Sequence, residues 1–158
     1  MADGPESDAA CEVWFYHLEQ ATLDRVLPEL LEKTLAKGWR AIVRAPSPER
    51  IEHLNGWLWA WKDDSFLPHG TAAEPDADRQ PILLTTEMGN PNAAQALFIV
   101  DGAECGPLDG FERCILLFDG RDEEALAEAR KRWKAFTAAG QPASYWRQTE
   151  RGAWEKKA

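Results

Sequence analysis

Short apolar runs and amphipathic stretches alternate along the chain, and the two patterns predict different elements. Continuous apolar runs are typical of strands that are covered on both faces. They predict strands at residues 13–16, 39–43, 81–85, 96–100 and 114–118, with a short final strand at 144–147. None of these runs approaches the roughly 18 apolar residues that a membrane span needs.

Between these runs, apolar residues recur at steps of three and four, so that they share one face of a helix. The spacing predicts helices over residues 22–37, from Ser47 to Leu58, and over 122–139. Ser47 and Asp122 can cap a helix N-terminus, and Gly140 can end the last helix. Pro28 lies inside the first helix and should kink it or mark a later start.

Strands that alternate with helices predict an α/β fold with three layers, in which helices flank a mainly parallel central sheet of Rossmann-like topology. We expect residues 1–11 to form a flexible leader, 12–148 a single α/β domain and 149–158 a charged C-terminal tail. Residues 70–80 are expected as a surface loop. The sequence contains no GxGxxG after a strand and no GxxxxGK followed by Ser or Thr, so no dinucleotide site or phosphate loop is predicted.

The balance of charges narrows the function classes. Lys and Arg number 18 and Asp and Glu 27, which gives a formal net charge of −9. A domain that grips a phosphate backbone by itself is usually strongly basic, so little direct nucleic-acid binding is expected. The three cysteines lack the spacing of a disulfide framework or a zinc knuckle, and the N-terminus lacks a secretory signal. We therefore expect a cytoplasmic protein that does not enter a membrane.

Candidate catalytic groups are sparse. His17, His53 and His69 are far apart and lack HxH or HExxH spacing, and hydrogen bonds to the backbone would explain His69 equally well. Adjacent acids are typical of solvated faces, helix caps and loops. The sequence predicts no catalytic residue, no metal site and no cofactor.

Two other features of the sequence point to a binding function, and the first is its content of aromatic residues. The chain has eight tryptophans, of which Trp57, Trp59 and Trp61 alternate. In an extended segment the three rings would lie on one side. They could be core residues, or some could be exposed anchors for a binding partner.

The second feature is a basic stretch near the end of the last predicted helix. Arg130, Trp133 and Lys134 are spaced to share one helix face. They form either a solvated helix end, where bases favour the negative end of the dipole, or a peptide pocket. In such a pocket the base holds a carboxylate while the indole contacts an apolar side chain.

Short motifs follow one another in a specific order along the chain. They are Val13-Trp14-Phe15-Tyr16, then Leu58-Trp59-Ala60 followed by Ser65-Phe66-Leu67-Pro68-His69, and then Arg130-Lys131-Arg132-Trp133-Lys134-Ala135-Phe136 before Ala139-Gly140. Together, over roughly residues 12–147, they resemble the chi subunit family of bacterial DNA polymerase III. The resemblance implies a non-catalytic accessory protein of the clamp-loader assembly in DNA replication.

The same resemblance implies two partners. Members of the family bind the acidic C-terminal tail of the single-stranded-DNA-binding protein and, on another surface, the small psi subunit. By matching motif positions, the tail pocket would be formed by Trp59, Phe66, Arg130 and Trp133. Arg130 would meet the terminal carboxylate, and the rings would hold the final apolar side chain.

This chain departs from the family pattern at one position of that pocket. Better-known members carry a second base one helical turn before the arginine, where this sequence has Leu126. Lys131, Lys134 or Arg121 could supply the missing charge.

Two other functions stay open. A small nucleotide-binding or nucleotide-hydrolysing α/β enzyme fits the fold class, although the phosphate loop is absent. A direct binder of single-stranded DNA would stack bases on exposed tryptophans and would depend steeply on salt.

Overall fold

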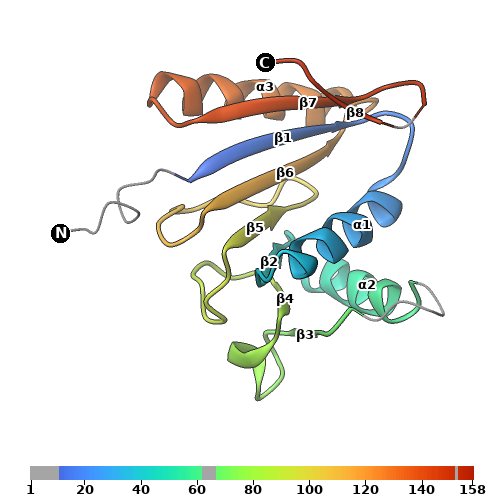
Figure 1. Cartoon of the computed structure of the whole chain (residues 1–158), viewed down its shortest axis with the longest axis vertical. Helices are drawn as coiled ribbons and strands as arrows, with labels where there is room; N and C mark the ends of the chain where they lie inside the picture. The colour runs from blue at the N-terminus through green and yellow to red at the C-terminus, as the bar shows by residue number, and fades with distance from the viewer. Residues whose placement is uncertain (1–10, 62–66, 152) are drawn as a thin grey trace.

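The computed structural model describes residues 11–61, 67–151 and 153–158, and its strands form one eight-stranded sheet (Figure 1). The strands are β1 (Glu12–Leu18), β2 (Ala41–Arg44), β3 (His69–Thr71), β4 (Ile82–Thr85), β5 (Ala96–Ile99), β6 (Arg113–Asp119), β7 (Ala143–Gln148) and β8 (Trp154–Lys156). Their order in the sheet is β3-β4-β2-β5-β6-β1-β7-β8. Neighbouring strands are parallel except β7 and β8, so the predicted mainly parallel sheet is confirmed.

Helices cover both faces of this sheet, which confirms the three-layer α/β architecture. The helices α1 (Leu23–Ala36) and α2 (Pro48–Trp59) lie on one face, and α3 (Glu123–Ala138) lies on the other. The crossovers through α1 and α2 run toward the β3 edge, whereas the crossover from β6 through α3 to β7 runs toward the β8 edge. Because parallel crossovers are right-handed, opposite directions place the helices on opposite faces.

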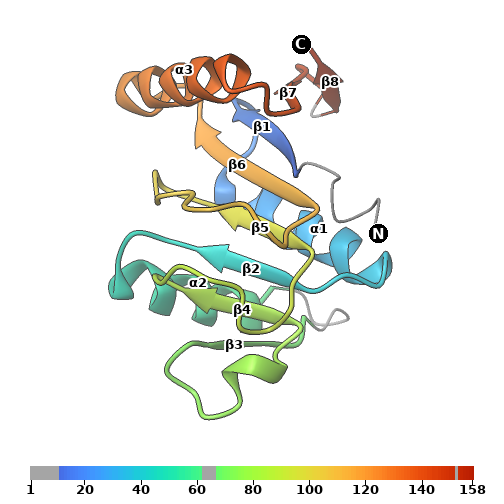
Figure 2. The same ribbon diagram turned by 90° about the vertical axis from the view of Figure 1, so that its left-hand side faces the viewer.

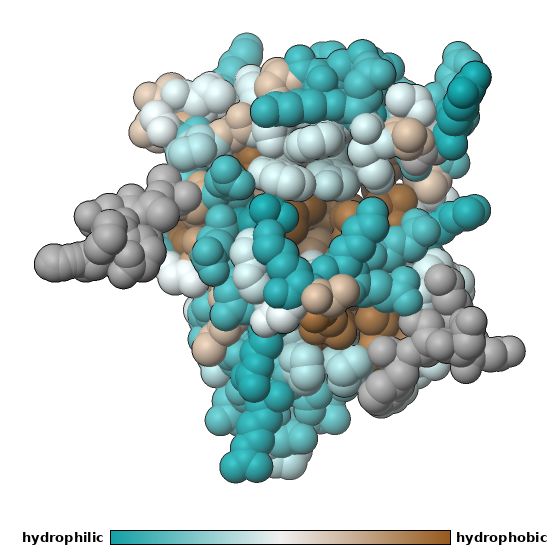
Figure 3. Space-filling model, in the orientation of Figure 1, coloured by the Kyte–Doolittle hydropathy of each residue, from teal (hydrophilic) through white to brown (hydrophobic). Residues whose placement is uncertain are grey.

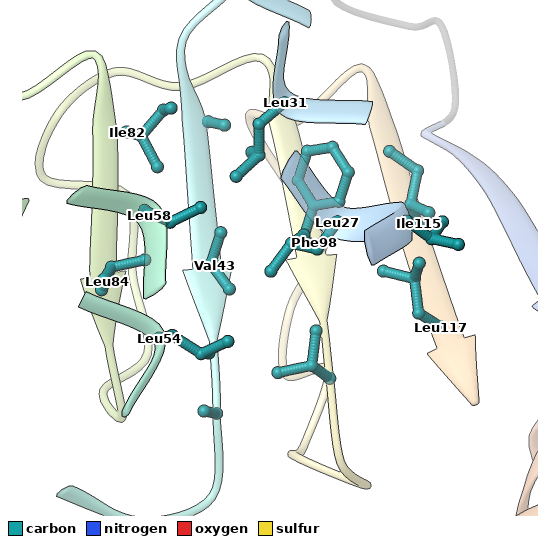
Figure 4. Packing of buried hydrophobic residues seen from close by; sticks show 14 of the residues in the cluster. Leu27, Leu31, Val43, Leu54, Leu58, Ile82, Leu84, Phe98, Ile115 and Leu117 are labelled. Atoms are coloured by element: carbon teal, nitrogen blue, oxygen red, sulfur yellow. The ribbon is translucent and has the colours of Figure 1, made fainter. Parts of the chain in front are cut away.

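The face under α1 and α2 is packed by the apolar stripes that predict these helices. Leu27 and Leu31 of α1 and Leu54 and Leu58 of α2 point onto the strands, where Val43 belongs to the same buried cluster (Figure 4). Each such side chain contributes roughly 1.5–3 kcal/mol relative to an exposed position. This burial fixes both helices on the sheet.

Among the described α-helices, only α3 covers the opposite face, and it contacts β6 and β7. Ala129, Trp133 and Phe136 of α3 pack in one apolar cluster with Phe15 of β1, which is fully buried. Asp122 caps the helix as predicted, because its carboxylate accepts hydrogen bonds from backbone N–H groups of the first turn. Loop residues such as Phe111 belong to the same cluster and cover part of this face.

Pro28 does not mark a later start of α1, because the helix begins at Leu23 and continues through the proline. A proline has no N–H to donate to the carbonyl four residues earlier, here that of Asp24. The indole Nε1–H of Trp57 donates to this carbonyl oxygen instead. A side chain from α2 therefore replaces the missing helical hydrogen bond.

Trp57 and Trp59 lie in a helix and not in an extended segment, so the condition under which the three rings would share one side is not met. Helix α2 continues through Trp59, since its apolar stripe packs on the sheet over the whole length. In a helix, residues two apart do not face one another, whereas residues four apart do. The rings of Trp57 and Trp61 accordingly lie 6.1 Å apart, and Trp59 points elsewhere.

Two predicted irregular segments contain short elements. The surface loop predicted at 70–80 begins with β3 and includes a 3-10 turn at Ala77–Arg79. The charged tail predicted at 149–158 contains β8, whose Trp154 ring lies 4.6 Å from that of Tyr16. Within the described residues, no helix combines the length and the apolar character needed to cross a membrane.

Candidate peptide-binding site

The structure separates the residues predicted to form one pocket. Arg130 and Trp133 lie on α3, whereas Trp59 lies at the end of α2, on the other face of the sheet. Helix α2 contacts β3 and β4, and α3 contacts β6 and β7, so the two helices also lie at opposite ends of the sheet (Figures 1 and 2). The prediction that Trp59 shares a pocket with Arg130 and Trp133 is therefore corrected. Phe66 lies outside the described residues.

Trp59 and Met88 are the most exposed large apolar side chains among the described residues, and 57% of the Trp59 surface is accessible. Its ring lies 4.3 Å from that of His69. The ring nitrogens of His69 lie 2.6 Å from the carbonyl oxygen of Leu67 and 3.2 Å from that of Asn55. The backbone hydrogen bonding predicted for His69 is thus confirmed, and the histidine supports the exposed indole.

The basic stretch on α3 divides into one structural cation and three exposed ones. The guanidinium of Arg132 lies 3.1 Å from Glu128 and donates to the carbonyl oxygen of Gly102 at 3.2 Å. Arg130, Lys131 and Lys134 are exposed and form no ion pair with any residue that the structure describes. These three cations are therefore available to a ligand.

Aromatic side chains lie beside this stretch. Trp133 is half-buried, and its ring meets the ring of Phe15 edge-on at 5.4 Å and that of Tyr145 at 5.9 Å. The ring of Phe118 lies 6.1 Å from that of Tyr145. Phe118 pairs with His17 near the carboxyl ends of β6 and β1, whereas Tyr145 lies in the middle of β7 opposite Phe15. Both Phe118 and Tyr145 pack against the apolar cluster on the α3 face.

His17 connects this aromatic cluster to a charged network. Its Nδ1 lies 2.7 Å from the Tyr145 hydroxyl, and its Nε2 lies 3.3 Å from the Glu19 carboxylate, which pairs with Arg147 at 2.6 Å. Burial lowers the pKa of His17; Glu19 opposes that shift, and the charges of Arg147 and Arg130 add to it. The Tyr145 pKa is raised by burial, while Arg147 and Arg130 act to lower it. The charge of Arg130 therefore acts on both His17 and Tyr145.

We call this arrangement the α3 site, made by His17, Phe118, Arg130, Trp133 and Tyr145. It combines an exposed guanidinium with half-buried rings, which suits a carboxylate attached to an apolar side chain. Sequence reasoning identifies Arg130 and Trp133 but misses the other three. His17 and Phe118 pair near the carboxyl ends of neighbouring parallel strands, and this signal could have found these two residues once the strand order is known.

The auxiliary cations differ in their positions. Lys131 and Lys134 flank Arg130 on α3, but the guanidinium of Arg121 is held 3.0 Å from Asp119 before the helix begins. Leu126, one turn before Arg130, is half-buried. The second guanidinium that acts on the same groups as Arg130 is that of Arg147, on β7.

A second cation among indoles occupies the opposite face. The guanidinium of Arg113 lies 3.9 Å from the ring centroid of Trp14 and 5.1 Å from that of Trp39, and the ammonium of Lys37 lies 4.0 Å from Trp39. These residues line a cleft of about 290 Å³ between α1 and the sheet, which we call the Arg113 cleft. In the space-filling view, apolar side chains appear in the middle of the surface with hydrophilic ones around them (Figure 3). Here the rings already hold the protein's own cation.

Comparison with known proteins relates the chain to one family. The family model described as "DNA polymerase III chi subunit, HolC" matches residues 11–144. A relative from Rickettsia prowazekii (strain Madrid E), named "Probable DNA polymerase III subunit chi", is 27% identical over 148 residues, which cover 89% of this chain and 88% of the relative. The range matched by the family model contains His17, Phe118, Arg130 and Trp133 of the α3 site.

Proposed function

The chain belongs to the DNA polymerase III chi subunit family, and on that premise we propose that it is a non-catalytic accessory subunit that binds the acidic C-terminal tail of the single-stranded-DNA-binding protein. It would do so in the cytoplasm, as part of the clamp-loader assembly, and link the polymerase to coated single-stranded DNA. The predicted psi-like partner stays a prediction, to which no residue is assigned.

One observation carries the proposal: Arg130 is exposed and forms no ion pair with a described residue, yet it stands beside half-buried rings. A guanidinium in this setting binds a terminal carboxylate through charge-assisted hydrogen bonds, while Trp133 and Tyr145 offer apolar contact to the last side chain. Lys131 and Lys134 on the same helix would attract the acidic residues upstream in the tail.

The overall charge makes this local group of cations selective. A formal net charge of −9 disfavours acidic partners over the surface as a whole, whereas the group of exposed cations on α3 attracts an acidic tail. A modest affinity is sufficient, because tethering within a replication assembly raises the effective concentration of the tail.

Titration of a labelled synthetic tail peptide tests the proposal. Arg130→Ala should weaken binding by about 1.5–3 kcal/mol, the range for hydrogen bonds to charged groups. Arg25→Ala is the matched control, because it removes the same charge from an exposed position on α1, on the other face. Equal affinities for wild type and Arg130→Ala would remove Arg130 from the site.

A peptide with an amidated C-terminus separates the carboxylate contact from general attraction. Against the wild type, amidation should cost about as much as Arg130→Ala does. Against Arg130→Ala, amidation should cost little more, because the two changes remove the same contact. Additive losses would show that Arg130 meets some other part of the tail.

A further inference from the structure

Three cysteines converge under the loop that connects β5 to β6. Cys11 precedes β1, Cys114 lies in β6 at the level of Val13, and Cys105 lies in the loop. All three belong to or pack against the apolar cluster on the α3 face. Cys11 and Cys114 are buried, whereas Cys105 is half-buried, so Cys105 is the one that solvent can reach.

A buried arginine beside these thiols lacks a carboxylate partner. Arg44 is only 2% exposed, and its guanidinium donates to the carbonyl oxygens of Glu87 at 3.0 Å, Glu104 at 3.2 Å and Cys105 at 2.6 Å. Within the described residues it pairs with no carboxylate. A buried charge is costly without a counter-charge. The ionisable groups that act on Arg44 are the thiols of Cys105 and Cys114.

A second guanidinium approaches Cys105 from α3. Nη1 of Arg132 lies 3.7 Å from the Cys105 sulfur, and Glu128 and the carbonyl of Gly102 hold this guanidinium in place. The half-buried guanidinium of Arg132 thus contacts the Cys105 sulfur, and the buried guanidinium of Arg44 binds the carbonyl oxygen of the same residue. Such surroundings favour the thiolate over the thiol.

The thiols of Cys105 and Cys114 act on each other's protonation. The hydrogen bond from Cys114 is the largest cause that lowers the pKa of Cys105 to about 7; burial opposes the shift, and Arg132 and Arg44 add to it. The same hydrogen bond and burial raise the pKa of Cys114. Cys105 is therefore the thiolate of the pair, and Cys114 keeps the proton.

We propose that Cys105 is a reactive modification site, which soft electrophiles alkylate and hydroperoxides oxidise, with Cys114 as the thiol that resolves the oxidised form. The Cys105 sulfur attacks one peroxide oxygen, the O–O bond breaks and hydroxide leaves, which gives a sulfenic acid. The Cys114 sulfur then attacks the Cys105 sulfur, and the S–O bond breaks. The leaving hydroxide takes the thiol proton as water, and a disulfide remains while the peroxide has been reduced by two electrons.

Alkylation of the full native chain with iodoacetamide, followed by peptide mass spectrometry, compares the three thiols within one molecule. At pH 7, Cys105 should react at least about tenfold faster than Cys11 and Cys114, since the thiolate is the nucleophile. Cys11 is the internal control, because burial and Glu12 raise its pKa to about 12. Equal rates at the three positions, or faster reaction at Cys11, would overturn the proposal.

Treatment with hydrogen peroxide tests the second step. The wild type should lose the mass of two hydrogens and yield a peptide linked through Cys105 and Cys114. Cys114→Ser should stop at a sulfenic acid that dimedone traps at Cys105, and Cys11→Ser should behave as the wild type. A disulfide that involves Cys11, or an unchanged loss of two hydrogens in Cys105→Ser, would contradict the assignment.

Arg132→Met tests the role of the guanidinium. The alkylation rate of Cys105 at pH 7 should fall by about threefold or more, while the rates at Cys11 and Cys114 stay the same. An unchanged Cys105 rate in a variant with a wild-type circular dichroism spectrum would exclude Arg132 from the site.

Discussion

The two faces of the sheet each place an arginine among aromatic rings, yet the two arginines differ in what they can still bind. In the Arg113 cleft, the guanidinium lies over Trp14 at 3.9 Å and also faces Trp39. In the α3 site, Arg130 is exposed and has no ion-pair partner among the described residues. The same residue types therefore hold a cation against rings on one face and leave a cation exposed on the other.

The surroundings of each arginine explain the difference. Around the Arg113 cleft, Trp14 also stacks on Trp146 at 5.2 Å, and the β8 residue Trp154 contacts Tyr16. These indoles belong to or pack against the apolar cluster under α1. At the α3 site, Arg130 lies on the exposed side of the helix. Its guanidinium can therefore bind a ligand without breaking an ion pair with a described residue.

Removal of the Phe15 side chain should cause the largest loss of stability on the α3 face. Phe15 is fully buried and touches the rings of Trp133, Phe136 and Tyr145, so Phe15→Ala should lower the free energy of unfolding by about 3–5 kcal/mol. Urea unfolding followed by circular dichroism measures the loss. Trp59→Ala is the control on the other face, and it should cost less than about 1 kcal/mol because this indole is exposed.

A methyl group at Gly120 should displace the His17 side chain of the α3 site. A Cβ there would lie 1.9 Å from Nε2 of His17, so Gly120→Ala must displace the imidazole and should cost about 1–3 kcal/mol. Gly56→Ala is the matched control, since a Cβ in α2 meets no atom within 4 Å and should stabilise the helix by about 0.5–1 kcal/mol. Equal effects of the two substitutions on the thermal midpoint would contradict this placement of His17.

Removal of the Arg113 side chain should affect stability and not tail-peptide binding. Arg113→Ala removes a cation from two indoles and should lower the free energy of unfolding by about 1 kcal/mol, with tail-peptide affinity unchanged. Arg130→Ala should weaken binding of the tail peptide and leave the unfolding midpoint in urea unchanged. If Arg113→Ala abolishes tail binding instead, the tail occupies the Arg113 cleft.

Titration of His17 should have the smallest effect on the free energy of unfolding. Burial lowers the pKa of His17 below the ordinary value of 6.5, so the unfolded chain binds the proton more readily than the native one. The contribution of His17 is therefore complete above about pH 7 and is lost as the pH falls through the native pKa. His17→Gln should flatten the dependence of stability on pH in this range, and urea unfolding at several pH values measures it.

Local sequence patterns predict the elements of this fold well and the assembly of its site poorly. Local patterns predict six of the strands, the caps at Ser47 and Asp122 and the common helix face of Arg130 and Trp133. They do not predict β3 or β8. The separation of Trp59 from Arg130 depends on the strand order, which no local pattern contains. The passage of α1 through Pro28 depends on Trp57, a residue from another helix.

A titration of the tail peptide into ¹⁵N-labelled protein, followed through the indole N–H resonances, tests the central claim most directly. The account predicts that the Trp133 resonance shifts and saturates with the peptide, while those of Trp14, Trp39 and Trp59 stay in place. Saturable shifts at Trp14 and Trp39, or at Trp59, with an unmoved Trp133 would place the tail on the opposite face of the sheet and contradict the account.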